Sequence, residues 1–405
     1  MTSAKASRPI ERLGRLLPEI TTVRAPYQAA VFRIGLSAVV LAFLLREWPH
    51  RHVLYGDRSP LSFELAQALV REERTFTVLA WGDGGIWFET VYAVTIAAAL
   101  AVLLGWRTRG TTVLLMAGVL SIINRNTLVG DGGDNVVRIM VIYLVFTRCA
   151  HVWSLDARRA RVCRDQPHLD PVGMLVWAAA VAVLVPLSTY PTGGWALVFW
   201  TLWAVQGLWY AAGLWFPRHE ARAVLDAAAS MLHNTAMLVI AAQVCLIYAT
   251  AGWYKIQGSR WQEGSALYYA LHLDYFSPWP ALSEYLAGST ITVLVLSYAT
   301  VMVQVAFPFT LANRKVKNVL LAVMMAEHLG IAVVLGIPFL SLAMVVCDAV
   351  FLPTPLLTAL GARCGRLVRS RSGGPGAVPQ PRTQDRPSSS ATESPVADAP
   401  ATEAV

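Results

Sequence analysis

The stretch "MLHNTAMLVIAAQVCLIYATAGWYKIQGSRWQEG", residues 231–264, holds a long apolar run that gives way at once to polar residues. The run ends at Tyr254 and is long enough to cross a hydrocarbon core of about 30 Å as a helix. Lys255 follows it directly, with Trp253 and Trp261 close in the sequence. The stretch therefore predicts a transmembrane helix whose end carries one lysine among aromatic rings.

The whole chain repeats this pattern of apolar runs and polar loops. Of its 405 residues, 56% are hydrophobic and only 14% are charged, and the mean hydropathy is +0.50. A soluble protein would carry about a quarter charged residues, and the strands of a β-barrel would alternate apolar and polar residues. We therefore predict an all-α fold, a polytopic helical integral membrane protein with about 8–10 transmembrane helices.

The predicted spans are the apolar runs themselves, and several are short for a bilayer. They are Ala29–Leu45, Phe88–Trp106, Thr111–Ile123, Asn135–Cys149, Val172–Tyr190, Trp195–Trp215, Met231–Tyr254, Thr290–Leu311, Val319–Leu335 and Phe339–Phe351.

Basic residues in alternate loops predict the orientation. Lysines and arginines precede the first span, follow every second span and follow the last, as the positive-inside rule requires. We expect a multi-pass protein of the cell membrane with both termini cytoplasmic and an even number of spans. The loops Arg46–Trp87, Asn124–Asp134 and Lys255–Ser289 would then be extracytoplasmic, and the first and third could hold re-entrant or interfacial helices. The expected partner is the lipid bilayer, in which the basic residues orient the protein. The net charge of +8 therefore does not indicate nucleic-acid binding.

Composition divides the chain into three parts. Residues 1–28 form an expected cytoplasmic tail without the apolar segment of a cleavable signal peptide, and residues 29–352 form the membrane domain. Residues 353–405 read as a cytoplasmic low-complexity tail, expected to be disordered from about residue 370. The five cysteines show no zinc or redox spacing, so no metal site is expected.

A polar, glycine-rich loop joins two of the shortest spans, in "NRNTLVGDGGDNVVRIMVIYLVF" (residues 124–146). If both helices stop short of the surface, Asp131, Asp134 and Arg138 would shape a polar pocket beneath the outer face. Alternatively, the loop is a solvated turn in which Asp134 and Arg138 pair at i, i+4. The sequence leaves both interpretations open.

Ionisable residues inside the spans are further candidates. Glu327 and His328 lie near the middle of a span, where such residues usually face the bundle interior and mark a functional site. A hydrogen bond to a neighbouring helix would explain them equally well. Arg33, Glu89 and Asp348 lie near span ends and are expected to reach water or to pair.

Lys255 has two interpretations. Its alkyl stem can be buried while the ammonium reaches water, with Trp253, Tyr254 and Trp261 forming an interfacial aromatic belt. Alternatively, the surrounding rings desolvate the amine, so that it loses its proton more easily and acts as a general base. Residue types alone do not choose between an anchor and a base.

Four segments give the chain a resemblance to a known family. They are the stretch 124–146 quoted above, "HVWSLDARR" (151–159), "YATAGWYKIQGSRWQEGSALYYAL" (248–271) and "EHLGIAVVLGIPFLSLAMVVCDAVFL" (327–352). Together they resemble the HTTM (horizontally transferred transmembrane) domain, the bacterial relatives of vitamin K-dependent γ-glutamyl carboxylase. Each motif is weak alone, but four in order over most of residues 29–352 are fairly specific.

The resemblance implies a role for Lys255. In the animal carboxylase, a lysine after an Ala-Gly pair deprotonates vitamin K hydroquinone, and the resulting anion reacts with O2. The strong base so formed abstracts a proton from a glutamate, to which CO2 adds. Lys255 stands at the matching position, and a reduced quinone is the implied cofactor. The family site lies on the lumenal face, which agrees with the outward face assigned here from loop charge.

The chain also departs from the carboxylase. The carboxylase has a catalytically important histidine before its Trp-Ser-Val-Asp motif. Here Trp153-Ser154-Leu155-Asp156 is similar, but Gly132-Gly133-Asp134 precedes it, so Asp134 stands near the place of that histidine. The stretch "AGWYKIQGSRW" carries one more residue between lysine and tryptophan. We expect no counterpart of the large lumenal domain that docks the protein substrate.

Two functional hypotheses follow. The first is an enzyme for quinol-dependent carboxylation, or a related oxidation, of a peptide or small molecule at the outer face. Lys255 would be its base, with Asp134 and His328 as further catalytic candidates. The candidate ligand-binding residues are Asp131, Arg138, Asn124 and Trp261. The second hypothesis is a non-catalytic membrane component for maturation, export or immunity of a secreted peptide. A transporter is less favoured because no inverted repeat is visible.

Overall fold

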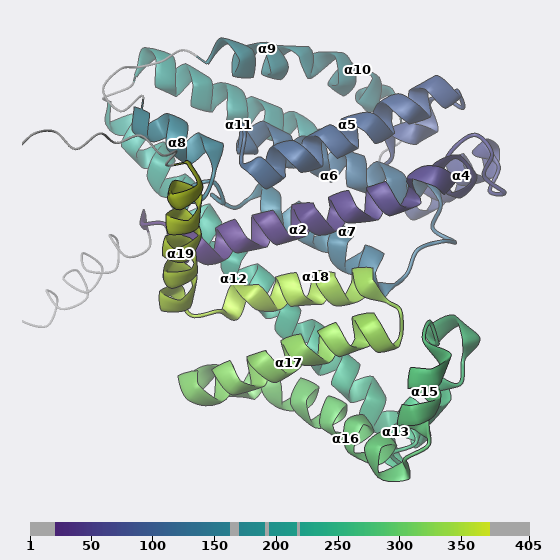
Figure 1. Ribbon diagram of the computed structural model, residues 1–405. Coiled ribbons are helices and arrows are strands. Elements are labelled where there is room, and N and C mark those ends of the chain that lie inside the picture. Colours follow the sequence, from purple (N-terminus) through teal and green to yellow (C-terminus); the bar gives the residue numbers. More distant parts are fainter. Residues whose placement is uncertain (1–20, 163–169, 191–193, 217–218, 373–405) are drawn as a thin grey trace, which may run out of the picture. The chain divides into compact units, whose positions relative to one another are not determined.

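The computed structural model describes residues 21–162, 170–190, 194–216 and 219–372, and within these ranges it contains helices and no strand (Figure 1). The predicted all-α class is confirmed. The chain forms one unit up to Thr358 and a second from Ala359, which begins inside α19 (Thr354–Ser372). The predicted low-complexity tail therefore starts as a helix. Most of the tail expected to be disordered, from residue 373 on, lies outside the described residues, as do residues 1–20.

Seven helices of the described residues are long and apolar enough to cross a membrane, or eight if a bent pair that includes α18 counts as one span. This confirms a multi-pass helical architecture. The seven are α2 (Pro26–Glu47, continued to Leu54), α5 (Gly85–Leu104), α9 with α10 (Pro171–Ala179 and Val181–Thr189), α11 (Trp195–Trp215), α12 (Glu220–Gln257), α16 (Thr290–Ala306, continued to Ala312) and α17 (Arg314–Val334).

Three shorter helices pack among these spans. They are α6 (Thr108–Arg125), α7 (Gly132–Val145) and α18 (Pro338–Asp348). Each of the predicted apolar runs is therefore helical over most of its length.

Short helices occupy the long loops that were expected to hold interfacial or re-entrant segments. They are α3 (Arg51–Leu54), α4 (Phe63–Glu73), α13 (Ser259–Gln262), α14 (Ala266–Leu271) and α15 (Pro280–Ala287), while α8 (Leu155–Val162) follows α7. The 3-10 turns are η1 (Trp48–His50), η2 (Val78–Trp81), η3 (Asp274–Phe276), η4 (Phe307–Ala312) and η5 (Ala349–Phe351).

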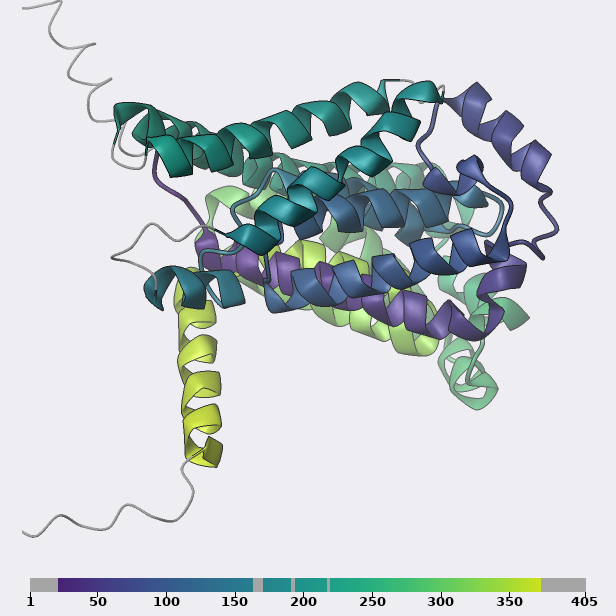
Figure 2. The same ribbon diagram turned by 90° about the horizontal axis from the view of Figure 1, so that it is seen from above.

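Helix α2 lies at the centre of one half of the bundle. It packs against α5, α7 and α18, and α5 packs against α6. Figures 1 and 2 both show α2, α5 and α6 running alongside one another. Phe32 and Leu36 are buried in this contact. A Cβ on Gly35 would lie 2.6 Å from Val346 Cγ2, so glycine permits the close approach of α2 and α18.

Helix α12 connects the two halves of the bundle. It contacts α7, α11, α16 and α18. With 38 residues it is about 57 Å long, which exceeds a hydrocarbon core of about 30 Å. Its first turns carry Glu220, Arg222 and Asp226, and only the later part is apolar. The apolar part ends at Lys255, and α13 begins shortly after it, at Ser259 (Figure 1).

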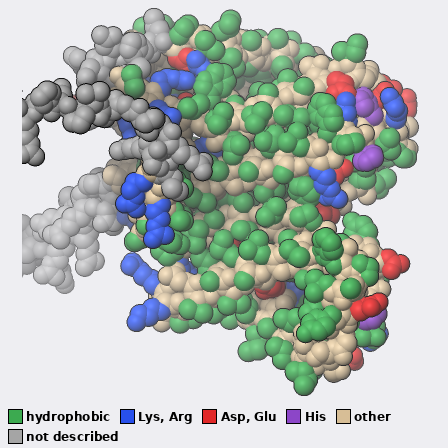
Figure 3. Space-filling model, viewed as in Figure 1, with side chains coloured by type: hydrophobic (Ala, Val, Ile, Leu, Met, Phe, Trp, Pro, Cys, Tyr) green, Lys and Arg blue, Asp and Glu red, His purple; other side chains and the backbone are tan. Residues whose placement is uncertain are grey.

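Charged side chains are distributed unevenly over the bundle. Figure 3 shows lysines and arginines at the end where α17 begins, which carries Arg314, Lys315 and Lys317. Most of the acidic and histidine side chains visible in this view lie at the other end, around α4 and α15. This asymmetry agrees with the alternating basic loops of the sequence. Which side of a membrane each end faces stays a prediction.

Candidate functional site

Lys255 belongs to a hydrogen-bonded row that joins three helices. Its Nζ donates to Gln304 Oε1 on α16 at 2.7 Å, and Gln304 Nε2 donates to Glu327 Oε1 on α17 at 2.8 Å. An ammonium only donates and a carboxylate only accepts, so the amide has one favourable orientation. We call Lys255, Gln304 and Glu327 the lysine row.

Local packing explains why the lysine meets this amide. Gly252 lies one turn before Lys255, and a Cβ there would be 2.5 Å from Val305 Cγ2. The absence of a side chain thus lets α12 approach α16 beside Gln304, which is buried. After α12 ends, α13 brings the Trp261 ring back to the lysine, with its centroid 5.3 Å from Nζ. Lys255 is therefore half-buried between an amide and an indole.

The three aromatic residues around Lys255 have different environments. Trp253 and Tyr254 are 60% and 73% exposed on the surface of the bundle, whereas Trp261 is half-buried. Only Trp261 has a ring contact with the amine among the described residues. The aromatic-belt interpretation suits the first two, and Trp261 belongs with the lysine row.

A second row lies deeper in the same group of helices. The Tyr248 hydroxyl donates to Asp348 Oδ1 on α18 at 2.9 Å and lies 3.1 Å from His328 Nε2 on α17. All three side chains are buried. We call Tyr248, His328 and Asp348 the tyrosine row. It lies about 10 Å from Lys255 along α12, two turns away.

Sequence reasoning found the charged members of these rows but missed Gln304 and Tyr248. Both are neutral polar residues within apolar helices, and a single residue of this kind does not by itself indicate a functional site. The i, i+7 spacing of Tyr248 and Lys255 could have placed both on one face of α12. Glu327 and His328 do face the bundle interior, as expected, although adjacent residues reach different rows.

The glycine-rich loop forms a helix cap. Asp131 Oδ1 accepts from two backbone N–H groups of the first turn of α7, at 2.6 and 3.2 Å. Asp134 Oδ2 accepts from the Asp131 N–H at 2.9 Å, which completes a capping box. Arg138 instead donates to Asn135 at 2.7 Å and to Asn124 at 3.4 Å. The suggested Asp134–Arg138 pair is therefore wrong, because the cap turns Asp134 back toward the helix start.

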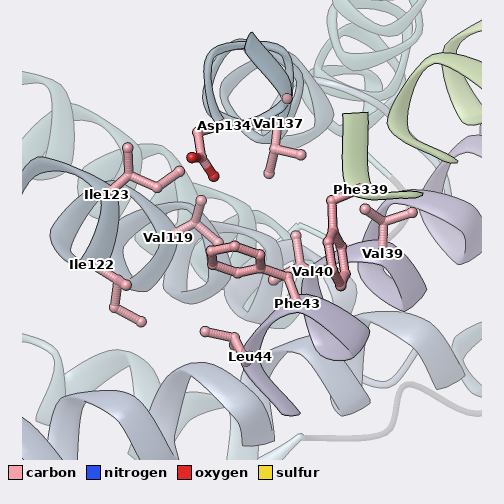
Figure 4. A pocket seen from close by; sticks show the side chains of 11 residues that line it. Val39, Val40, Phe43, Leu44, Val119, Ile122, Ile123, Asp134, Val137 and Phe339 are labelled. Atoms are coloured by element: carbon pink, nitrogen blue, oxygen red, sulfur yellow. The ribbon is translucent and has the colours of Figure 1, made fainter. Parts of the chain in front are cut away.

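Asp134 also borders a shallow apolar pocket between α2, α6, α7 and α18, which encloses about 390 Å3 including its open mouth (Figure 4). Its lining is Val39, Val40, Phe43, Leu44, Val119, Ile122, Ile123, Gly133, Asp134, Val137 and Phe339. No member of the lysine row belongs to this lining. The structure thus gives Lys255, Asp134 and His328 three separate environments rather than one shared cavity.

The three ionisable residues expected at span ends behave differently. Glu89 pairs with Arg51 at 2.6 Å, as predicted. Asp348 was expected to reach water or to pair. It does not reach water, since it is fully buried and bonded to Tyr248, because α18 packs against α12.

Arg33 is also fully buried, and it neither reaches water nor pairs with a carboxylate among the described residues. Its guanidinium donates to the carbonyls of Leu103 and Trp153, both at 2.7 Å, to Cys149 O at 3.2 Å and to Val102 O. The arginine therefore ties α2 to the end of α5 and to the segment after α7. The prediction for Arg33 is wrong because backbone acceptors replace both water and acid.

The Trp153–Asp156 motif has a structural role beside this arginine. The Asp156 carboxylate accepts from the backbone N–H groups of Arg107 and Thr108, at 2.9 and 2.8 Å, at the start of α6. The motif therefore caps a helix and closes the turn between α5 and α6.

No family model, curated protein or solved structure matches the chain. The resemblance to the HTTM domain stays a prediction from the motifs. Within the described ranges, no three His, Cys, Asp or Glu side chains come close enough to hold a metal ion. The candidate functional sites are therefore the two hydrogen-bonded rows inside the helical bundle.

Proposed function

We propose that the protein is a multi-pass membrane enzyme in which Lys255 acts as a base toward a hydroxyl of a membrane-soluble substrate. The observation that carries this proposal is the partner of the lysine. Nζ bonds to the neutral amide of Gln304, and the carboxylate of Glu327 lies one hydrogen bond further away. A proton can therefore leave and return at Nζ without the breaking of a direct ion pair. The likeness of Lys255 to the family's base supports the same role.

Each neighbour of the lysine has a distinct task in this proposal. Gln304 fixes the position of the amine through its side-chain oxygen. Glu327 stabilises the positive charge that Lys255 acquires with a proton, acting through the polarised amide. Trp261 covers the amine with a ring face, which favours the cationic form and limits access of water. These residues would move and hold one proton at Nζ.

A reduced quinone suits this set of side chains. The row offers both donors and acceptors to a phenolic hydroxyl, and Trp261 offers an apolar aromatic surface. Lys255 and Trp261 would hold the quinone, which would supply a weakly acidic hydroxyl and two electrons. We propose quinol-dependent carboxylation, or a related oxidation, of a peptide or small molecule. The alternating basic loops support a site on the extracytoplasmic face of the cell membrane.

Oxidation of reduced menadione by the full-length protein in lipid nanodiscs tests the proposal, with oxygen consumption and quinone absorbance as readouts. We expect turnover by the wild type and a loss of about 100-fold or more in both Lys255→Ala and Lys255→Arg, since general bases contribute about 10²–10⁴-fold. Arginine keeps the charge but stays protonated, so it cannot replace a base.

Lys317→Ala is the matched control, because Lys317 is a half-buried lysine that bonds to the Phe351 carbonyl, outside the lysine row. Its turnover should equal that of the wild type. Retained turnover in Lys255→Arg would show that charge alone suffices. Absence of turnover in the wild type would contradict the enzyme proposal and favour a non-catalytic component that acts on a secreted peptide.

A further inference from the structure

The tyrosine row has a defined direction. A hydroxyl carries one proton, and when Asp348 is ionised its carboxylate only accepts, so in this state the Tyr248 hydroxyl donates to Asp348 Oδ1. The contact of 3.1 Å between the hydroxyl and His328 Nε2 must then be a hydrogen bond donated by the histidine. Nε2 therefore carries a proton. The row runs from an imidazole N–H through a hydroxyl to a carboxyl oxygen, with a proton donor at one end and an acceptor at the other.

Both ends of the row have an unpartnered polar atom. His328 Nδ1 and Asp348 Oδ2 are buried and make no hydrogen bond within the described residues. A buried polar group without a partner is unfavourable, because it has lost its hydrogen bonds to water. His328 Nδ1 and Asp348 Oδ2 are therefore atoms at the two ends of the row that can each hold a proton.

The surroundings of the row keep it away from water. The Phe307 ring packs edge-on against Tyr248 with centroids 5.7 Å apart, and Phe351 packs on Phe307 at 5.1 Å. Cys347 beside Asp348 is fully buried. A full imidazolium and a full carboxylate are expensive in such a medium.

Other titratable groups face the row without a hydrogen bond to it. They are Glu327 on α17, Lys255 and Cys245 on α12, and Cys347 on α18. They can shift the pH at which the row takes up a proton, but they are not part of its hydrogen-bonded path.

We propose that Tyr248, His328 and Asp348 form a proton-holding relay inside the bundle, in which one proton is shared between the imidazole and the carboxyl group through the hydroxyl. In the transfer, the Nε2–H bond of imidazolium His328 breaks as its proton passes to the Tyr248 oxygen. The original hydroxyl proton passes to Asp348 Oδ1. Imidazolium and carboxylate become neutral imidazole and carboxylic acid, and no electrons are exchanged. The inference goes beyond the proposed enzyme and rests on different residues.

Infrared difference spectroscopy of the full-length protein in nanodiscs, recorded across a pH series, tests the relay. We expect a protonated-carboxyl band that is lost in Asp348→Asn and kept in Glu327→Gln, which removes the half-buried carboxyl group next to His328 in the sequence. In the wild type, the carboxyl and imidazole bands should change together at shared pH midpoints, as coupled groups do. In Tyr248→Phe, the two sets of midpoints should differ by about one pH unit or more.

Tyr92→Phe is the matched control, because Tyr92 is fully buried and its hydroxyl donates to the Leu44 carbonyl at 2.6 Å, outside the row. It removes a buried hydroxyl from the same fold and should leave both bands unchanged. If Tyr248→Phe also leaves both midpoints unchanged, or if no band depends on Asp348, the row is structural and the relay is refuted. Neither result bears on menadiol oxidation, so the two proposals can fail separately.

Discussion

Arg33 and Lys255 are two cations held inside the same helical bundle, and their partners differ. Arg33 is fully buried and donates to four backbone carbonyls. Lys255 is half-buried and has one hydrogen-bond acceptor among the described residues, the side-chain oxygen of Gln304. Arg33 is therefore held by several backbone atoms, whereas Lys255 is held by a single side chain.

The difference indicates what each cation can do. Helix ends leave carbonyls without intrahelical partners, and the planar guanidinium satisfies several of them at once. Val102 O also accepts from the Gly105 N–H, but removing Arg33 would take the guanidinium donor from all four carbonyls, so its role is structural. The Lys255 ammonium has three N–H donors and one hydrogen-bonded acceptor, Gln304 Oε1, so it can donate to a further acceptor, and it lies beside an aromatic face. A cation that is incompletely bonded at a half-buried position is the better candidate for chemistry.

Replacing each cation separately by methionine tests whether Arg33 and Lys255 have different roles. Arg33→Met should destabilise the fold by about 3–5 kcal/mol, because four carbonyls lose the guanidinium donor inside the bundle. Thermal unfolding in detergent and the folded yield measure this loss. Arg33→Lys should not restore stability, since an ammonium lacks the planar fork. A loss below about 1 kcal/mol would show that the carbonyls find other partners.

Lys255→Met should have a smaller effect on stability, about 1 kcal/mol. A single hydrogen bond is lost, and the unbranched methionine side chain keeps the apolar contacts of the lysine stem. The same unfolding assay measures it beside Arg33→Met. Equal losses in the two variants would make the lysine row a helix clamp and remove the distinction between the cations. A small loss of stability together with lost menadiol turnover would support the distinction between a structural arginine and a functional lysine.

Arg138→Met should have the smallest effect, within about 0.5 kcal/mol. Arg138 is half-buried, and its partners are the side chains of Asn135 and Asn124. The capping box of α7 does not involve it. A larger loss would mean that this arginine organises the glycine-rich loop, and it would then belong with Arg33.

The positions of the helices could be predicted from the amino-acid sequence. A hydrocarbon core demands long apolar segments with internally bonded backbones, so the runs around α2, α5, α11, α12 and α17 could be read directly. The sequence also marked the residues whose burial would be unusual, Arg33, Glu327, His328 and Asp348.

The hydrogen-bond partners of these residues follow from how the helices pack and could not be predicted from the sequence. The i, i+4 spacing suggested a pair between Asp134 and Arg138, yet the cap at Asp131 turned Asp134 the other way. Gln304 and Tyr248 acquired importance because α16, α17 and α18 close on α12. The physical reason is that apolarity and helical period act along one chain segment. A buried hydrogen bond instead needs two groups from different helices within about 3 Å, and no single segment specifies that distance.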